Sequence, residues 1–298
     1  MFKRVGLFLL TNIGIIVVIS IILSVLNIGP YLNQYGLNYQ ALLIYALVIG
    51  FTGAFISLFI SKWMAIHAFS VRLIQKPEHA KEAWLLDKVQ KLARQRNIST
   101  PDVGIYESPE ANAFATGWNK NKALLAVSTQ LLHVMDEDEV EGVLGHEISH
   151  ITNGDMVTMA LVQGVVNTFV IFFARIAAFM VMQFLRKDDD APIEGGFIYY
   201  GVAILFEILF GILASTVVMW FSRQREFRAD KGSAQVVGKA KMIKALQRLQ
   251  QLENQMPEDD RAPAFNSMKI SDKSRWLALF ASHPPLTQRI EALNALKF

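Results

Sequence analysis

Apolar residues are gathered into four long blocks that predict membrane-spanning helices. Residues 7–26 and 41–60 carry no charge, and each block is about 20 residues long, enough for a helix to cross a hydrocarbon core of about 30 Å. Residues 156–185 and 197–221 are similar, but each contains an ionisable residue, which is expensive in lipid. These two blocks are either true spans or a hairpin packed partly within protein, and we favour spans.

The ionisable residues of the third and fourth blocks are Arg175 and Glu207. They either pair with one another within the hairpin or mark a water-filled cavity, and we favour the pair.

The first block follows Lys3 and Arg4, as the apolar core of a secretory signal peptide does. Its apolar core is too long for such a peptide, and the segment 27–30 (NIGP) lacks the small residues of a cleavage site. The pattern therefore favours a retained anchor helix.

Basic residues near the block ends predict how the chain is oriented. They precede the first block and follow the second and the fourth, whereas the loop 29–40 has none. Only residues 186–187, between the third and the fourth block, do not fit this pattern. Because Lys and Arg are retained on the cytoplasmic side, we expect both termini and the polar segments to be cytoplasmic. The expected organisation is a helix pair (1–66), a first cytoplasmic part (67–155), a membrane hairpin (156–221) and a second cytoplasmic part (222–298).

The two polar parts are together long enough for one hydrophobic core. Their periodicities predict a small sheet among helices: helices at 77–97, from Asp136 to about Gly154, at 239–252 and after Pro285; short strands at 103–106, 113–115 and 124–128; and a loop at 253–274.

Composition narrows the chemistry. Charged residues make up 18% of the chain against about 25% in a typical soluble domain, and the apolar blocks account for the shortfall. The net charge of +3, with no long basic run, argues against nucleic acid as a partner. The chain has no cysteine, so a metal site here must use His, Asp and Glu.

The predicted helix from Asp136 to about Gly154 contains an H-E-x-x-H pattern at His146, Glu147 and His150. Residues four apart lie on one helical face, so both imidazoles can bind one zinc ion. Glu147 would then accept a proton from the water that zinc activates and deliver one to the leaving amine. The alternative is a helix with two histidines that bind no metal. Three polar residues so close together argue against this alternative.

A catalytic zinc usually has three protein ligands. Glu226 and Asp230 also lie four apart, and we expect Glu226 to bind zinc while Asp230 accepts the N–H of a liganding imidazole. Taken alone, such a pair is most often a solvated helix face. His150 precedes the third block by six residues, however, and Glu226 follows Trp220 by six, so an antiparallel hairpin would bring both to one membrane surface. At about 1.5 Å per residue, the metal would lie within roughly 10–15 Å of the lipid.

These residues carry a family resemblance. The sequence resembles the HtpX-type bacterial membrane zinc metalloproteases, relatives of the CAAX prenyl proteases. The resemblance covers nearly the whole chain: the four apolar segments, Asn112 to Gly117 (NAFATG), His146 to His150, Asn153 to Asp155, Arg225 to Asp230 and Ser282 to Pro285.

The resemblance implies a mainly α membrane protein with four transmembrane helices and a cytoplasmic α+β catalytic domain of the zincin (gluzincin) type. It implies one Zn²⁺ per chain, held by His146, His150 and Glu226, with Glu147 as general base. It also implies that Asn112 to Gly117 is an active-site edge strand, so that Asn112, Ala113, Phe114 and Ala115 would bind an extended substrate; an ordinary hairpin strand is the alternative. His283 would stabilise the oxyanion, although a lone histidine before two prolines is otherwise a loop residue.

The predicted function is therefore a zinc endopeptidase of the bacterial inner membrane. The resemblance implies quality control of misfolded or misassembled membrane proteins under stress, in cooperation with other membrane proteases. A zinc sensor or transporter is disfavoured because no candidate ligand lies within a span. A prenyl-protein protease is disfavoured because four helices are few for an enclosed chamber.

Overall fold

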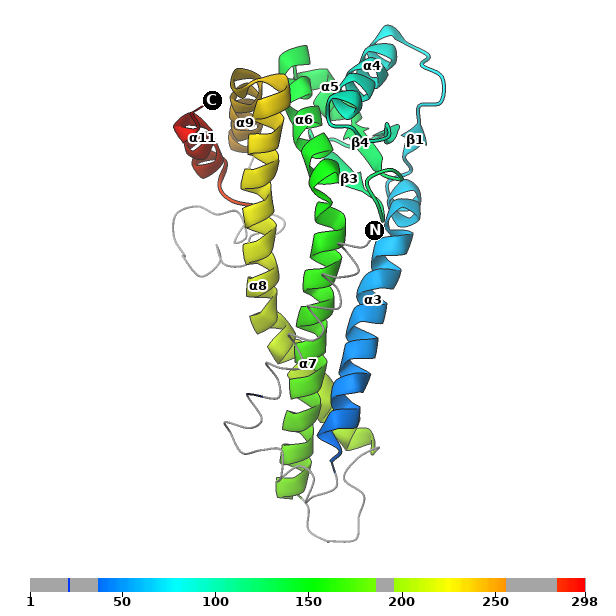
Figure 1. The fold of residues 1–298 in the computed structure, drawn as a ribbon, viewed down its shortest axis with the longest axis vertical. Coiled ribbons are helices and arrows are strands. Elements are labelled where there is room, and N and C mark those ends of the chain that lie inside the picture. Colours follow the sequence, from blue (N-terminus) through cyan, green and yellow to red (C-terminus); the bar gives the residue numbers. More distant parts are fainter. Residues whose placement is uncertain (1–20, 22–36, 186–195, 256–282, 298) are drawn as a thin grey trace. The chain divides into compact units, whose positions relative to one another are not determined.

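The computed structural model describes residues 21, 37–185, 196–255 and 283–297. Contacts divide the chain into two units (Figure 1). Unit 1 comprises Met1–Ile56 and Ala160–Val218, and unit 2 comprises Ser57–Met159 and Met219–Phe298. The predicted first span, at 7–26, lies outside the described residues except for Ile21.

The described part of unit 1 contains three long apolar helices that continue into unit 2. They are α3 (Tyr39–Ala68), α7 (Asp155–Leu185) and α8 (Phe197–Val237), and each is long and apolar enough to cross a membrane. A helix satisfies its own backbone hydrogen bonds, which a segment in lipid requires. The described residues thus contain three of the four predicted spans.

Close packing and one ion pair hold the helices of unit 1 together. A methyl group added at Gly164 of α7 would lie 2.5 Å from a ring carbon of Phe51, and one at Gly50 would lie 2.8 Å from the Thr168 nitrogen. Small residues therefore let α3 and α7 approach closely. The predicted Arg175–Glu207 pair is present, with 3.3 Å between Nη2 and Oε1.

Unit 2 contains a four-stranded mixed sheet in the order β1-β2-β4-β3. Its strands are β1 (Arg72–Leu73), β2 (Asp102–Tyr106), β3 (Ala113–Thr116) and β4 (Leu124–Ser128). β2 and β4 run parallel, while β1 and β3 pair antiparallel with their neighbours. In the part of the chain that the structure describes, β4 is the only strand that pairs with β3, so β3 is an edge strand.

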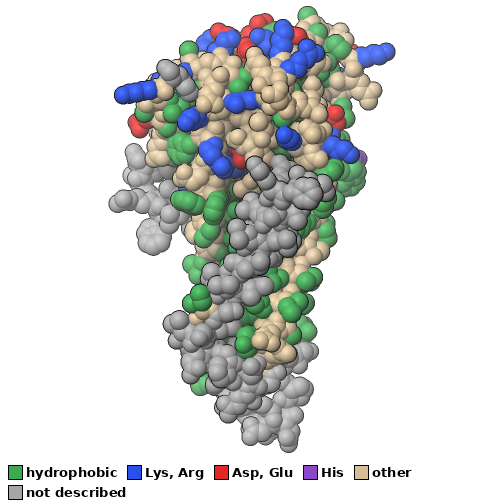
Figure 2. Space-filling view, in the orientation of Figure 1, with side chains coloured by type: hydrophobic (Ala, Val, Ile, Leu, Met, Phe, Trp, Pro, Cys, Tyr) green, Lys and Arg blue, Asp and Glu red, His purple; other side chains and the backbone are tan. Residues whose placement is uncertain are grey.

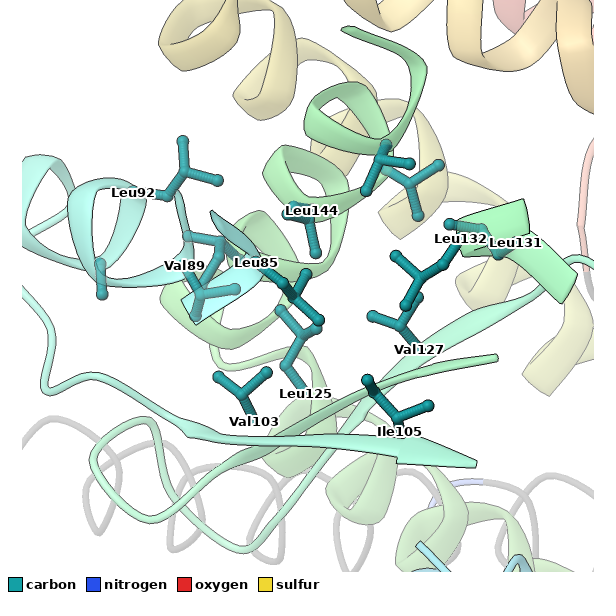
Figure 3. Close-up of a cluster of buried hydrophobic side chains, with 14 of the residues drawn as sticks. Leu85, Val89, Leu92, Val103, Ile105, Leu125, Val127, Leu131, Leu132 and Leu144 are labelled. Atoms are coloured by element: carbon teal, nitrogen blue, oxygen red, sulfur yellow. The ribbon is translucent and has the colours of Figure 1, made fainter. Parts of the chain in front are cut away.

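The core of unit 2 fills the space between one face of the sheet and three helices (Figure 3). These helices are α4 (Ala80–Gln95), α5 (Thr129–Val134) and α6 (Glu137–Asn153). Val103, Ile105, Leu125 and Val127 alternate along β2 and β4 and meet Leu144 of α6 in this core. The period-2 pattern of the strands thus places α6 against the sheet.

Helix α6 is defined by strong signals at both ends. Asp136 and Glu139 form a capping box, and Gly154 ends the helix with a φ of 70°, a left-handed conformation that favours glycine. At Gly145 an added methyl group would lie 2.6 Å from Ser233 Oγ of α8. This glycine therefore allows α6 and α8 to pack closely in unit 2.

Unit 2 also contains the helices α9 (Lys239–Gln255) and α11 (Leu286–Ala295). Both confirm predicted helices. The strands β2, β3 and β4 were also predicted to within about one residue, whereas β1 and α5 were missed. The loop prediction at 253–274 is wrong for 253–255, which belong to α9, and its remainder lies outside the described residues.

The two units differ in the side chains that they expose. In the described part of unit 1, Arg175 and Glu207 are the only charged residues. The Lys, Arg, Asp and Glu side chains visible in Figure 2 accordingly gather on unit 2.

Candidate metal centre

Helix α6 presents two histidines on one face. The His146 and His150 rings are 4.6 Å apart in an edge-on arrangement, and their Nε2 atoms are separated by 3.0 Å. Glu147 lies between them in the sequence and is buried, with 8% of its surface exposed. The i, i+4 spacing thus brings the two imidazoles together as predicted from the sequence.

Helix α8 adds Glu226 to this pair. Its Oε2 lies 3.4 Å from His146 Nε2 and its Oε1 lies 3.3 Å from His150 Nε2. Tetrahedral coordination with bonds of about 2.0–2.1 Å separates ligand atoms by about 3.3 Å. The three side chains, which offer ligand atoms within 4.8 Å of one another, therefore form a candidate metal site with suitable spacing.

Carboxylates on the far side of each ring fix the imidazole tautomers. Asp230 Oδ1 lies 2.8 Å from His146 Nδ1, and Asp155 Oδ2 lies 2.6 Å from His150 Nδ1. Since an ionised carboxylate only accepts hydrogen bonds, each Nδ1 carries a proton, and Nε2 is the nitrogen that can bind a metal ion once it has lost its own proton. Both Nε2 atoms face the Glu226 carboxylate, and a metal cation satisfies such a set of ligand atoms.

The Glu226 carboxylate itself indicates a missing positive charge. Both of its oxygens are buried and, among the described residues, neither has a hydrogen-bond partner, although three imidazole nitrogens lie within 3.4 Å. A buried, unsatisfied carboxylate is costly. The donor set therefore fits a divalent metal ion.

Arg289 of α11 joins this network from a distant part of the sequence. Its Nε and Nη2 donate to the two oxygens of Asp230 at 2.7 and 2.6 Å, and its Nη1 lies 3.6 Å from Glu226 Oε2. Such a bidentate pair fixes the position of the carboxylate as well as its charge. Arg289 thereby holds Asp230 against His146.

The metal-free site shifts several pKa values. Burial alone would lower the pKa of His146, but its contacts with the Asp230 and Glu226 carboxylates more than offset it and raise that pKa. In the same way, burial opposes but Asp155 and Glu226 raise the pKa of His150 to about 9. Burial would raise the pKa of Glu226, and its contacts with the histidines hold it well below the usual range. The carboxylates thus give the metal-free site a strongly negative electrostatic potential.

The structure places His283 beside the candidate ligand Glu226 and β3 beside the helix α6. His283 Nδ1 is 3.0 Å from Glu226 Oε2, and its side chain is 61% exposed, so it reaches the ligand carboxylate from the solvent side. Asn112 is exposed and directly precedes β3 rather than lying in it. α6 packs against β3, so the edge strand adjoins the helix that carries the histidines.

The side chains of β3 divide between two faces of the sheet. Ala113 and Ala115 pack against the core that contains α6, whereas Phe114 contacts Phe69 and Tyr106 on the opposite face. The strand alternation gives this division. Phe114 therefore differs from its neighbours in the predicted substrate-binding set, because its ring points away from α6.

Sequence reasoning missed two residues of the site. Asp155 belongs to a motif that the family resemblance quoted, but it was given no role; its position five residues after His150, beyond the Gly154 cap, is the available signal. Arg289 carried no signal, since only the folded chain brings α11 to Asp230.

Two buried histidines and a buried glutamate around one point, on and beside an H-E-x-x-H helix, define a metallopeptidase site. The long apolar helices make the protein membrane-bound. The sequence model of "Peptidase family M48" matches residues 79–297, and the chain belongs to this family.

Individual relatives agree. The chain is 49% identical to "Protease HtpX homolog" of Methylacidiphilum infernorum, over 99% of each chain. It is 51% identical to "Protease HtpX" of Tolumonas auensis, over 99% of this chain and all of that one. It shares its fold with the crystal structure of S. mikatae Ste24p at a TM-score of 0.64, with 18% identity, 99% of this chain covered and 67% of that one.

Proposed function

We propose that this membrane-bound metalloprotease is a zinc endopeptidase of the bacterial inner membrane. The observation that carries the proposal is the convergence of His146, His150 and Glu226, with both Nε2 atoms within 3.4 Å of the Glu226 carboxylate. Two imidazoles and one carboxylate form the ligand set of several catalytic zinc sites, whereas Ca²⁺ and Mg²⁺ prefer all-oxygen sets. One Zn²⁺ per chain follows.

Bound zinc supplies Lewis acidity, which polarises a peptide carbonyl and makes water acidic enough to react near neutral pH. The buried Glu147 accepts the proton of the attacking water and later delivers it to the leaving amine. Asp230 and Asp155 keep both Nδ1 atoms protonated and the rings oriented. His283, exposed beside Glu226, is placed to donate to the oxyanion.

The edge strand β3 binds substrate by adding a strand. Ser128 N donates to Asn112 O at 2.9 Å, directly before the ladder pair of Ala113 with Val127. Because hydrogen-bonded pairs alternate with non-bonded ones, this bond places the backbone groups of Ala113 and Ala115 on the side away from β4. In the described part of the chain no other strand pairs with β3, so these groups can pair with an extended substrate, and the Asn112 side chain is exposed beside them.

The substrates that we propose are misfolded or misassembled membrane proteins and other unfolded polypeptides. Pairing through the backbone of β3 recognises any extended segment and demands no particular side chain. The distribution of Lys and Arg supports four spans, with both termini and the catalytic part in the cytoplasm. Cleavage on that side, during stress and alongside other quality-control proteases, is the role we assign.

The test is cleavage by the purified full-length chain in detergent, with an unfolded soluble protein and a membrane-anchored protein as substrates. We expect a zinc chelator to abolish cleavage of both and added Zn²⁺ to restore it. Cleavage that continues at full rate after chelation, with zinc removal verified by elemental analysis, would contradict the proposal.

A further inference from the structure

Besides the metal site, unit 2 carries an exposed aromatic cluster where helix α3 leaves its apolar segment. Phe59, Ile60, Trp63 and Met64, near the end of α3, are 58%, 40%, 63% and 49% exposed. A soluble surface seldom gathers so many large apolar side chains. The uncharged run of α3 ends at Lys62, the first charged residue after residue 40, which marks where the helix reaches water.

The turn between β3 and β4 (residues 117–123) joins this cluster. The ring of Trp118 packs on Phe59 with 5.8 Å between centroids, and Lys122 Nζ lies 5.4 Å from the centre of the Trp118 ring. Trp and Tyr favour the membrane–water boundary, where an apolar ring meets polar groups. Trp118 is thus held beside Phe59, three residues before Lys62, where the boundary is expected.

The turn is rigid enough to fix that position. Gly117 has a φ of 136°, and an added methyl group there would lie 2.7 Å from the Lys122 oxygen. Asn119 accepts from the Asn121 backbone nitrogen through Oδ1, and its own carbonyl accepts from Lys122 N at 3.1 Å. These bonds order the turn, which holds the half-buried Trp118 side chain against Phe59.

Its charges also suit a lipid surface. Lys120 and Lys122 are exposed on the turn. Lys62, by contrast, bonds Asp102 of β2 at 2.6 Å and so faces the sheet. Basic side chains next to an apolar anchor are attracted by anionic headgroups.

A second tryptophan in unit 2 provides the contrast. Trp84 of α4 also has a lysine over its ring, Lys88 at 5.8 Å, but it packs against the core that contains α6. A lysine over an indole is therefore no sign of lipid contact by itself. What distinguishes Trp118 is its contact with Phe59, an exposed residue of a membrane-spanning helix.

We propose that the β3–β4 turn is a membrane anchor, with Trp118 in the lipid interface and Lys120 and Lys122 on anionic headgroups. Trp118 follows Ala115 by three residues, about 10 Å of extended chain. If β3 binds substrate, as proposed above, the anchor presents the edge strand to segments that emerge from the bilayer. The lipid contact itself does not depend on that role.

The chain has no cysteine, so single cysteines can be labelled without background. A nitroxide at Lys120→Cys would report on the turn in full-length protein reconstituted in vesicles of phosphatidylethanolamine and phosphatidylglycerol. Collisions with oxygen, which partitions into lipid, are compared with collisions with a water-soluble nickel chelate. Ile49→Cys on the exposed apolar side of α3 and Gln95→Cys at the exposed end of α4 give the lipid and water references.

We expect nickel accessibility at Lys120→Cys to be severalfold below that of Gln95→Cys, with oxygen accessibility closer to Ile49→Cys. Adding Trp118→Ala should shift the label to the Gln95→Cys values, whereas Trp84→Ala should not. A label that matches Gln95→Cys in the otherwise unchanged chain would overturn the proposal. Exclusion of both reagents would also overturn it, because it indicates cover by protein. Neither readout needs activity, so a failure of the zinc-endopeptidase proposal would leave this test intact.

Discussion

Helix α8 carries acidic residues in two contrasting surroundings. In unit 1, Glu207 pairs with Arg175 at 3.3 Å, and their side chains are 29% and 15% exposed. The Arg175 guanidinium also lies 5.6 Å from the ring of Tyr200. One positive charge meets one negative charge, so the charges of this pair balance one another.

In unit 2, Glu226 and Asp230 are almost completely buried, with side chains 1% and 2% exposed. Glu147 and Asp155 are buried with them, and Arg289 provides the one buried guanidinium in the described part of this network. Negative charge is in excess, and the Nε2 atoms of two imidazoles face the Glu226 carboxylate. The contrast teaches that burial of charge alone does not mark a binding site; an unmatched set of acceptors does.

The largest effect should come from removing a ligand. Zinc sites contribute about 10–16 kcal/mol, or roughly 3–4 kcal/mol per ligand, so Glu226→Ala should weaken zinc binding several-hundredfold or more. Glu207→Ala on the same helix should leave zinc affinity unchanged. Competition with a chromophoric chelator measures both. Equal effects of the two substitutions would abolish the distinction between the two regions.

Breaking the other pair should affect stability instead. Glu207→Ala leaves Arg175 without its partner in a membrane span, at a cost of about 2.5–3.5 kcal/mol. The double substitution Arg175→Met with Glu207→Leu should recover most of this loss, because it removes both charges. Unfolding in mixed micelles gives the free energies. A double variant as unstable as the single one would show that the pair does more than neutralise charge.

Substitution of the carboxylates that contact the histidines should lower zinc affinity by an intermediate amount. Asp230→Asn keeps the shape of the side chain but weakens its hold on His146 Nδ1, and we expect a 10–100-fold loss of zinc affinity. Arg289→Lys should lower zinc affinity by a smaller factor, because lysine cannot make the bidentate contact with Asp230. Zinc titration of the stripped protein provides the measurement; unchanged affinity in Asp230→Asn would refute the positioning role.

The smallest effect expected is a graded dependence on pH. The pKa of His150 in the metal-free site is raised to about 9, so below that pH zinc must displace a proton from the ring. Zinc affinity should therefore fall on acidification, by up to about tenfold per pH unit for one proton. Asp155→Asn removes a cause of the raised pKa and should flatten this slope between neutral pH and about pH 9. An affinity that is constant over this range in the unaltered chain would contradict the assignment.

The metal site was the most predictable part of the molecule. His146, His150 and Glu226 follow from helical spacing and from the apolar hairpin, which both depend on local periodicity. The capping box at Asp136 and the glycine stop at Gly154 are local signals too, and both are present.

Contacts between distant segments were less predictable. Asp230 was expected to touch an imidazole, but nothing in the sequence specified that Arg289 would fix it from α11, because that contact depends on how α11 packs against α9. The two-residue strand β1 is too short to show a period. Strand alternation explains why Phe114 lies on the face of the sheet opposite to Ala113 and Ala115, once the core-facing residues are known. The sequence alone does not distinguish the two faces.

The most direct test of the central claim is the zinc content and peptidase rate of Glu147→Gln, measured on the same purified sample. The amide keeps the size of the side chain and leaves all three candidate ligands in place, so one zinc per chain should remain. Without a general base, the cleavage rate should fall by about 10²–10⁴-fold. Retention of both zinc and full cleavage would contradict the account.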